Sequence, residues 1–188
     1  MTTASRLLTA GLALAALCVA LALLPGNAAA AQCKGGDVSP GKLTDKRAAK
    51  AVLCLLNKER RHHHLKPLRR QRAQTKAARS HNKRMLSRRC FSHRCPGEPD
   101  LTGRLTQTGY LPCNCSWGIA ENIAYGSGGA GSPRGIVTAW MHSPEHRANI
   151  LNPAWRQIGI AAVTSPDAPG TYAGLGVTVI TTDFGVRR

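Results

Sequence analysis

Six cysteines lie beyond the N-terminal segment of this chain, and they constrain its fold more than any other feature. They are Cys33, Cys54, Cys90, Cys95, Cys113 and Cys115. An even number of cysteines in an exported chain is typical of a disulfide framework, and six allow 15 pairings that a sequence does not separate. A zinc cluster is the alternative, but the chain contains no C-x-x-C pair. We therefore expect disulfides.

The N-terminal segment supplies the evidence for export. Arg6, its single charge, precedes an apolar run over residues 7–24, and Pro-Gly-Asn and four alanines follow at residues 25–31. This order is typical of a signal peptide. A membrane anchor is the alternative, but a run of mostly Ala and Leu that ends at Pro-Gly makes a poor membrane span. The sequence predicts a secreted protein, and Cys18 would be removed with the signal.

The remaining chain is long enough for one domain with its own core. We expect a signal peptide over residues 1–31, a short leader over residues 32–42 that is held at Cys33, and a single domain over residues 43–188.

Positive charge is concentrated in one third of the chain. Between Lys42 and Arg94 there are 18 Lys and Arg residues against two acids, whereas six Arg and six acids lie from Cys95 onward. Such a segment would attract an anionic cell-wall polymer, a lipid or a membrane surface. A solvated helix face with no partner is the alternative. Nucleic acid is disfavoured because the segment lacks the interleaved aromatic side chains that stack on bases.

Apolar periodicity predicts helices in the first two thirds of the chain. One helix begins after the N-cap Thr44 and runs to about Arg61, and a second covers residues 73–85 with His81 on its core side. A shorter helix covers residues 101–108 and ends at Gly109. Ser132-Pro133 opens a fourth helix that stops before Pro144, where Ser143 can cap a fifth.

The last third changes to residues typical of strands. Residues 157–163 and 172–181 are rich in Val, Ile, Thr and Gly, and a turn at residues 166–170 separates them, which predicts an antiparallel hairpin. Helices followed by strands indicate an α+β domain with helices packed on a small antiparallel sheet.

Three segments stand out by composition, namely residues 90–93 (CFSH), 120–126 (AENIAYG) and 139–151 (AWMHSPEHRANIL). In this order they resemble the bacterial branch of the CAP superfamily, the cysteine-rich secretory, antigen 5 and pathogenesis-related proteins. Further matches are LLNKER at residues 55–60 and TDFG at residues 182–185. The resemblance spans the mature chain from about Cys33 to Gly185.

The resemblance implies a three-layer α-β-α sandwich with a central cleft. Matched position by position, His93 and His146 are the two cleft histidines and Glu121 is the cleft acid. The fourth member is less well defined, because no carboxylate follows Trp140 directly, and Glu145 is a substitute from a different backbone position.

Two imidazoles and one carboxylate are also a set that suits zinc, with an open fourth position. His93, His146 and Glu121 are therefore a hypothetical metal site. The alternative for these three is a buried polar network. Glu145 can equally serve the helix N-terminus, and His81 reads as a satisfied helix-face histidine rather than a ligand.

The cysteines bracket these residues, since Cys90 and Cys95 flank His93, and Cys113 and Cys115 precede Glu121. Bridges between the two pairs would tie the His93 loop to the Glu121 segment, and a Cys33–Cys54 bridge would pin the leader to the first helix. Both pairings are hypotheses.

The sequence favours a non-enzymatic extracellular or cell-wall binding module with a His/Glu cleft and a basic helical face. No Ser lies in a G-x-S-x-G turn and the mature cysteines are assigned to disulfides, so a nucleophile is missing. A metal-dependent hydrolase of peptidase type, with Glu121 or Glu145 as general base, is the alternative, and the sequence leaves the choice open. Proteins of this family are often linked to lipid or sterol binding.

Overall fold

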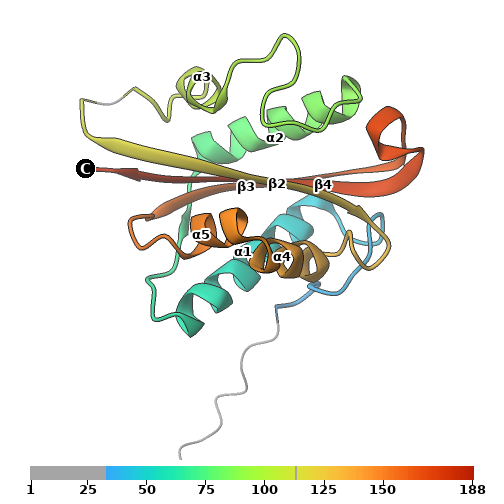
Figure 1. The fold of residues 1–188 in the computed structure, drawn as a ribbon, viewed down its shortest axis with the longest axis horizontal. Helices are drawn as coiled ribbons and strands as arrows, with labels where there is room; N and C mark the ends of the chain where they lie inside the picture. Colours follow the sequence, from blue (N-terminus) through green and yellow to red (C-terminus); the bar gives the residue numbers. More distant parts are fainter. Residues whose placement is uncertain (1–32, 113) are drawn as a thin grey trace, which may run out of the picture. The chain divides into compact units, whose positions relative to one another are not determined.

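The computed structural model describes residues 33–112 and 114–188, which form three layers (Figure 1). Helices α1 (Asp45–His62), α4 (Pro133–His142) and α5 (Pro144–Leu151) cover one face of a sheet. Helices α2 (Arg72–Ser87) and α3 (Leu101–Gln107) cover the other face. The α-β-α sandwich implied by the resemblance is therefore confirmed.

The sheet has the strand order β1-β3-β4-β2. Its strands are β1 (Arg69–Arg70), β2 (Trp117–Ser127), β3 (Gln157–Ala168) and β4 (Leu175–Arg187). Strands β2, β3 and β4 pair antiparallel, and β1 pairs with β3 in parallel. The expected β3–β4 hairpin is confirmed, but both strands are longer than predicted. Tyr172 belongs to a 3₁₀ turn, Gly170–Tyr172, rather than to a strand.

The predicted helix boundaries hold closely because local side chains set them. Thr44 and Ser132 lie at the N-caps of α1 and α4, where each side-chain oxygen accepts a hydrogen bond from a backbone N–H. Pro133 occupies the first helical position of α4, as expected. Gly109 follows α3 with a φ of 79°, a left-handed conformation that glycine adopts at no steric cost.

The apolar core lies mainly between the sheet and the α1, α4 and α5 layer. Large side chains fill it, including Trp140, Ile158 and Phe184. The opposite face of the sheet carries two smaller apolar clusters, one around Met85 and Tyr172 and one around Leu105 and Tyr110. The space between α2, α3 and the sheet also holds the buried polar residues of the candidate site.

Two disulfides are defined within the described residues. Cys33 bonds Cys54, which confirms the predicted attachment of the leader to α1. Cys90 bonds Cys95, so the expected bridges from these two cysteines to Cys113 and Cys115 are wrong. The chain between Cys90 and Cys95 is long enough to close a local loop, which no spacing rule excludes. Cys115 is also disulfide-bonded, and Cys113 lies outside the described residues.

The predicted signal peptide also lies outside the described residues. Within residues 33–112 and 114–188, no helix has the length and apolar character needed to cross a bilayer.

Candidate functional site

Strand β2, at one edge of the sheet, positions the central acid of the site. Successive side chains of a strand point to opposite faces, and here Glu121 faces the α2 and α3 layer while Asn122 faces α5. The Asn122 side-chain amide donates to the carbonyl of His146 at 3.0 Å. The Glu121 side chain is only 3% exposed. The segment 120–126 thus forms a strand that was not predicted, and it joins the two helical layers.

Both carboxylate oxygens of Glu121 have partners. His93 Nδ1 lies 2.8 Å from Oε1 and donates to it, and Arg104 Nη2 donates to Oε2. Burial by itself raises the pKa of Glu121, but the His93 hydrogen bond and the charges of Arg104 and His81 outweigh it, so the pKa is lowered overall. Glu121 is therefore a paired carboxylate in the folded protein.

Arg104 organises the same region from helix α3. Its Nη1 donates to the carbonyls of His93 at 2.8 Å and Pro99 at 3.2 Å, while its Nη2 holds Glu121. The planar guanidinium can make these contacts at once because its donors form a rigid fork. One buried side chain thereby fixes both the His93 loop and the Glu121 carboxylate.

His93 lies at the exposed end of this cluster, in the loop that the Cys90–Cys95 disulfide closes. Its side chain is 60% exposed, and the disulfide and the hydrogen bond from Tyr172 Oη to the Cys90 carbonyl hold the base of the loop. A ligand at the surface would therefore meet the His93 ring before it met Glu121.

His81 and Glu98 form a second pair beneath the loop. His81 Nδ1 lies 2.8 Å from Glu98 Oε2, and the histidine is fully buried. Burial lowers the pKa of His81, and the Arg104 charge lowers it further against the opposing charges of Glu121 and Glu98. Its Nε2, 3.9 Å from Glu121 Oε2, has no hydrogen-bond partner among the described residues. His81 faces the core as predicted, but the expectation of a satisfied histidine holds only for Nδ1, since Nε2 has no hydrogen-bond partner in the described part of the chain.

Asp183 lies next to Glu121 across the strand pair. The β2–β4 register sets the two residues directly opposite each other, and Asp183 is fully buried. Neither of its oxygens accepts a hydrogen bond from a donor among the described residues. Burial raises the pKa of Asp183 well above its usual value, and the charge of Glu121 raises it further. In its neutral form, Asp183 would donate its proton to the Glu121 carboxylate beside it.

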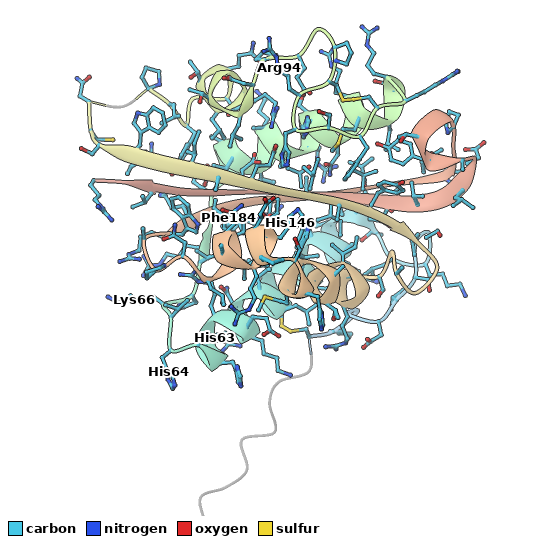
Figure 2. The ribbon with its side chains drawn as sticks, in the orientation of Figure 1. His63, His64, Lys66, Arg94, His146 and Phe184 are labelled. Carbon is cyan, nitrogen blue, oxygen red and sulfur yellow. A yellow bond between two sulfur atoms is a disulfide. The ribbon has the colours of Figure 1, made fainter. Side chains whose placement is uncertain are left out.

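His146 comes from the other helical layer. Figure 2 places it on the α4–α5 side of the sheet, whereas Arg94, next to His93 in sequence, lies beyond the opposite face. His146 Nδ1 lies 2.7 Å from Ser143 Oγ, and its ring stacks on Trp140. Burial lowers the pKa of His146, and the charge of His93 lowers it further. His93 thus acts on His146 through charge around the β2 edge.

Glu145 is exposed in the first turn of α5. Its charge raises the pKa of the neighbouring His146 against the larger effect of burial. Ser143 occupies the N-cap position as expected, but its hydroxyl makes no capping bond and lies against His146 instead. Glu145 therefore acts on the site through charge, from outside the Glu121 cluster.

The geometry does not suit the hypothetical zinc site. Within the described residues, no group of three or more His, Cys, Asp and Glu side chains could hold a metal ion. The charged Arg104 occupies one Glu121 oxygen and His93 the other. A metal cation at Glu121 would have to displace the buried guanidinium of Arg104, which is itself positively charged and already bonded to the carboxylate.

Sequence reasoning missed Arg104, Glu98 and Asp183. In the sequence, Arg104 resembles an ordinary exposed cation on a short helix. The one available signal is its position three residues after Leu101 and next to Leu105, which is fully buried and marks the inner face of the helix. Asp183 lies in the TDFG match at residues 182–185, and that match predicts no function for it. The contacts of these three residues join segments that are far apart in the sequence, through the strand register and the packing of α3 on the sheet. Local sequence patterns do not reveal such contacts.

Comparison with known proteins agrees with this fold. The chain is 36% identical to the uncharacterized protein YkwD of Bacillus subtilis over 118 residues, which are 62% of this chain and 42% of that protein. The chain thus spans less than half of that relative.

Solved structures share the architecture. An outer surface protein of Borrelia burgdorferi matches with a TM-score of 0.63 and 19% identity over 79% of this chain and 99% of the other. An extracellular protein with an SCP domain from Bacillus anthracis matches with a TM-score of 0.56 and 24% identity over 79% of this chain and 45% of the other. These similarities concern the fold.

The model of the cysteine-rich secretory protein family, CAP, matches residues 53–181, which is more than half of the chain. The match includes the His93 loop, the Glu121 strand and the His146 helix. The chain belongs to the CAP family.

Proposed function

We propose that this chain is secreted and acts as a non-enzymatic binding module that attaches to anionic polymers of a cell envelope. The observation that carries the proposal is the basic surface. Of the 18 Lys and Arg residues between Lys42 and Arg94, 15 are exposed, and only Arg60 is buried. So many exposed cations create a positive potential that attracts polyanions over a distance.

The two acids in this segment neutralise little of that charge. Asp45 is half-buried in the first turn of α1, where it accepts a hydrogen bond from the backbone N–H of Thr164 at 3.2 Å. Its contact with Arg79 is 3.9 Å long. Glu59 is also half-buried. The positive charge therefore faces solvent largely uncompensated.

Secretion is supported by the order of the N-terminal residues and by relatives. Two proteins with the same fold are described as extracellular and as an outer surface protein. The Cys33–Cys54 and Cys90–Cys95 disulfides fit an oxidising location outside the cytoplasm.

The contacts of Glu121 favour binding over catalysis. A general base needs an accessible oxygen and a pKa near the working pH, but Glu121 is buried, both its oxygens are occupied and its pKa is lowered. The cluster is better suited to hold the His93 loop in one conformation. We therefore assign these residues a structural role rather than a hydrolytic one.

The secreted protein is expected to bind immobilised poly(glycerol phosphate) and not neutral dextran. Because association releases counterions from the polyanion, the logarithm of the binding constant should fall linearly as the logarithm of the salt concentration rises. The measurement is a bead-binding isotherm at several NaCl concentrations. Equal retention on dextran, or binding that ignores salt, would contradict the proposal.

A further inference from the structure

The exposed cations do not form one helical face. Helices α1 and α2 carry most of them, and these helices lie on opposite faces of the sheet (Figure 1). The segment that connects the two helices passes the sheet edge as strand β1. A polymer that lies along this edge can therefore reach cations of both layers.

A groove of about 640 Å³ lies at this edge. Its lining residues are Lys66, Pro67, Arg69, Arg70, Arg156 and Gln157. Four of the six are cations, and none is acidic. All four cations are exposed, and Figure 2 shows Lys66 at the rim of the molecule. The volume is within the range of pockets that hold small ligands.

Two polar side chains of α1, the buried Arg60 and the half-buried Asn57, hold the backbone that leads into the groove. Arg60 Nε donates to the carbonyl of Lys66 at 2.9 Å, and its Nη1 donates to the carbonyls of Ile150 and Asn152 at 2.7 and 3.0 Å. Asn57 exchanges two hydrogen bonds with the backbone of Leu68. These contacts fix the segment before β1 against the end of α5, so the groove is rigid before any ligand arrives.

Two of the lining guanidinium groups are also positioned in advance. Arg156 Nη1 donates to the carbonyls of residues 153, 154 and 155. Arg70 Nε donates to Thr75 Oγ1 at 3.4 Å. Ordering a flexible cation costs conformational entropy on binding, and these contacts reduce that cost for Arg70 and Arg156.

The groove carries an electrostatic penalty in the free protein. Burial lowers the pKa of Arg60, and the charge of Arg156 lowers it further. No lining residue offers a negative charge in return. A bound anion would relieve the repulsion between Arg60 and Arg156.

We infer that this groove, lined by Lys66, Arg69, Arg70 and Arg156, binds consecutive phosphates of a phosphodiester polymer that lacks bases. Arginine forks match phosphate oxygens, and several cations along one groove suit a repeated charge. No aromatic side chain is among the lining residues, so the stacking platform typical of single-stranded nucleic acid sites is missing there. The inference rests on the proposed attachment to anionic polymers and gives it a location.

The test compares two double variants of the full secreted protein that remove equal charge. R69Q/R70Q removes two groove cations, and K50Q/K83Q removes two exposed lysines from α1 and α2 outside the groove. With poly(glycerol phosphate) in low salt, R69Q/R70Q should bind about tenfold more weakly than wild type, with a salt slope smaller by about 0.7 for each cation lost. K50Q/K83Q should bind within about twofold of wild type, since its lysines act only at long range.

Folding of both variants is checked by thermal unfolding, and R69Q/R70Q should be at least as stable as wild type because it removes like charges. Equal losses in the two variants would overturn the groove while leaving polymer attachment intact. No polymer binding by wild type would overturn both proposals. Tighter binding of a single-stranded oligonucleotide of matched charge, or of inorganic phosphate alone, would also overturn the assigned ligand class.

The same variants separate recognition from a protective role of the charges. Charged side chains on an edge strand can prevent sheets from pairing edge to edge. If R69Q/R70Q kept full polymer affinity but formed dimers or larger species on size-exclusion chromatography, the arginines would serve that role and the groove would not be a binding site.

Discussion

Replacing Arg104 with alanine is expected to lower the free energy of unfolding by about 3 to 5 kcal/mol, because removal of one partner leaves a buried charge uncompensated. Arg104 is 3% exposed and donates to Glu121, to the His93 carbonyl and to the Pro99 carbonyl. Urea unfolding followed by circular dichroism measures the change.

Two further variants identify the cause of that loss. R104K keeps the charge but not the fork that reaches the separate oxygens, so it should recover only part of the stability. In the double variant R104M/E121L both charges are absent, and the loss should be smaller than the sum of the single losses. Arg147→Ala, at an exposed position of α5, should change stability by less than about 0.5 kcal/mol. A cost below about 1 kcal/mol for R104A would show that the cluster does not depend on this pair.

Much of the fold was predictable because its signals are local. The caps at Thr44 and Ser132, the helix stop at Gly109 and the hairpin after residue 157 each depend on a few adjacent residues. Strand β2 was missed because its sequence, with Gly118, Ala120, Asn122 and Gly126, lacks the regular alternation of a strand with one buried face. It forms since β4 supplies a partner along its whole length.

The candidate site was less predictable because its contacts cross between layers. His93 and Glu121 were expected together, and their side chains are in contact. His146 lies on the other side of the β2 edge and bonds Ser143. The partner of Cys90 also had no sequence signal, since every pairing of the six cysteines fits an exported chain. The strand register and the packing of the layers determine the His93–Glu121 contact and the position of His146.

Asp183→Asn is expected to stabilise the protein at neutral pH, and the stabilisation should increase as the pH rises. Asp183 is fully buried, has no hydrogen-bond donor among the described residues and lies opposite Glu121. Burial and the charge of Glu121 raise its pKa well above the usual value. Folding at neutral pH must therefore return a proton to a group that is ionised in the unfolded chain. Asparagine has nearly the same shape, needs no proton and can donate its N–H to Glu121.

The sign of the pH dependence follows from linkage. A carboxyl whose pKa is raised in the folded state contributes no penalty below its unfolded pKa, near 4, and an increasing penalty above it. The penalty is about 1.4 kcal/mol for each unit by which the pH exceeds the unfolded pKa, until the folded pKa is reached. The difference in unfolding free energy between D183N and wild type should thus be small at pH 4 and grow toward pH 7.

Other groups titrate in this range, so the comparison between the two proteins is more informative than either curve. The pKa values of His81 and His146 are lowered, which reduces stability as the pH falls below about 6.5 in both proteins. Asp167→Asn, at an exposed position of β3, should produce no such divergence. If D183N were less stable than wild type at pH 7, Asp183 would be ionised and held by a partner, and its proton could not be the donor to Glu121. If the predicted divergence is measured, Asp183 is protonated at neutral pH, and its proton is available to the Glu121 carboxylate beside the donors His93 and Arg104.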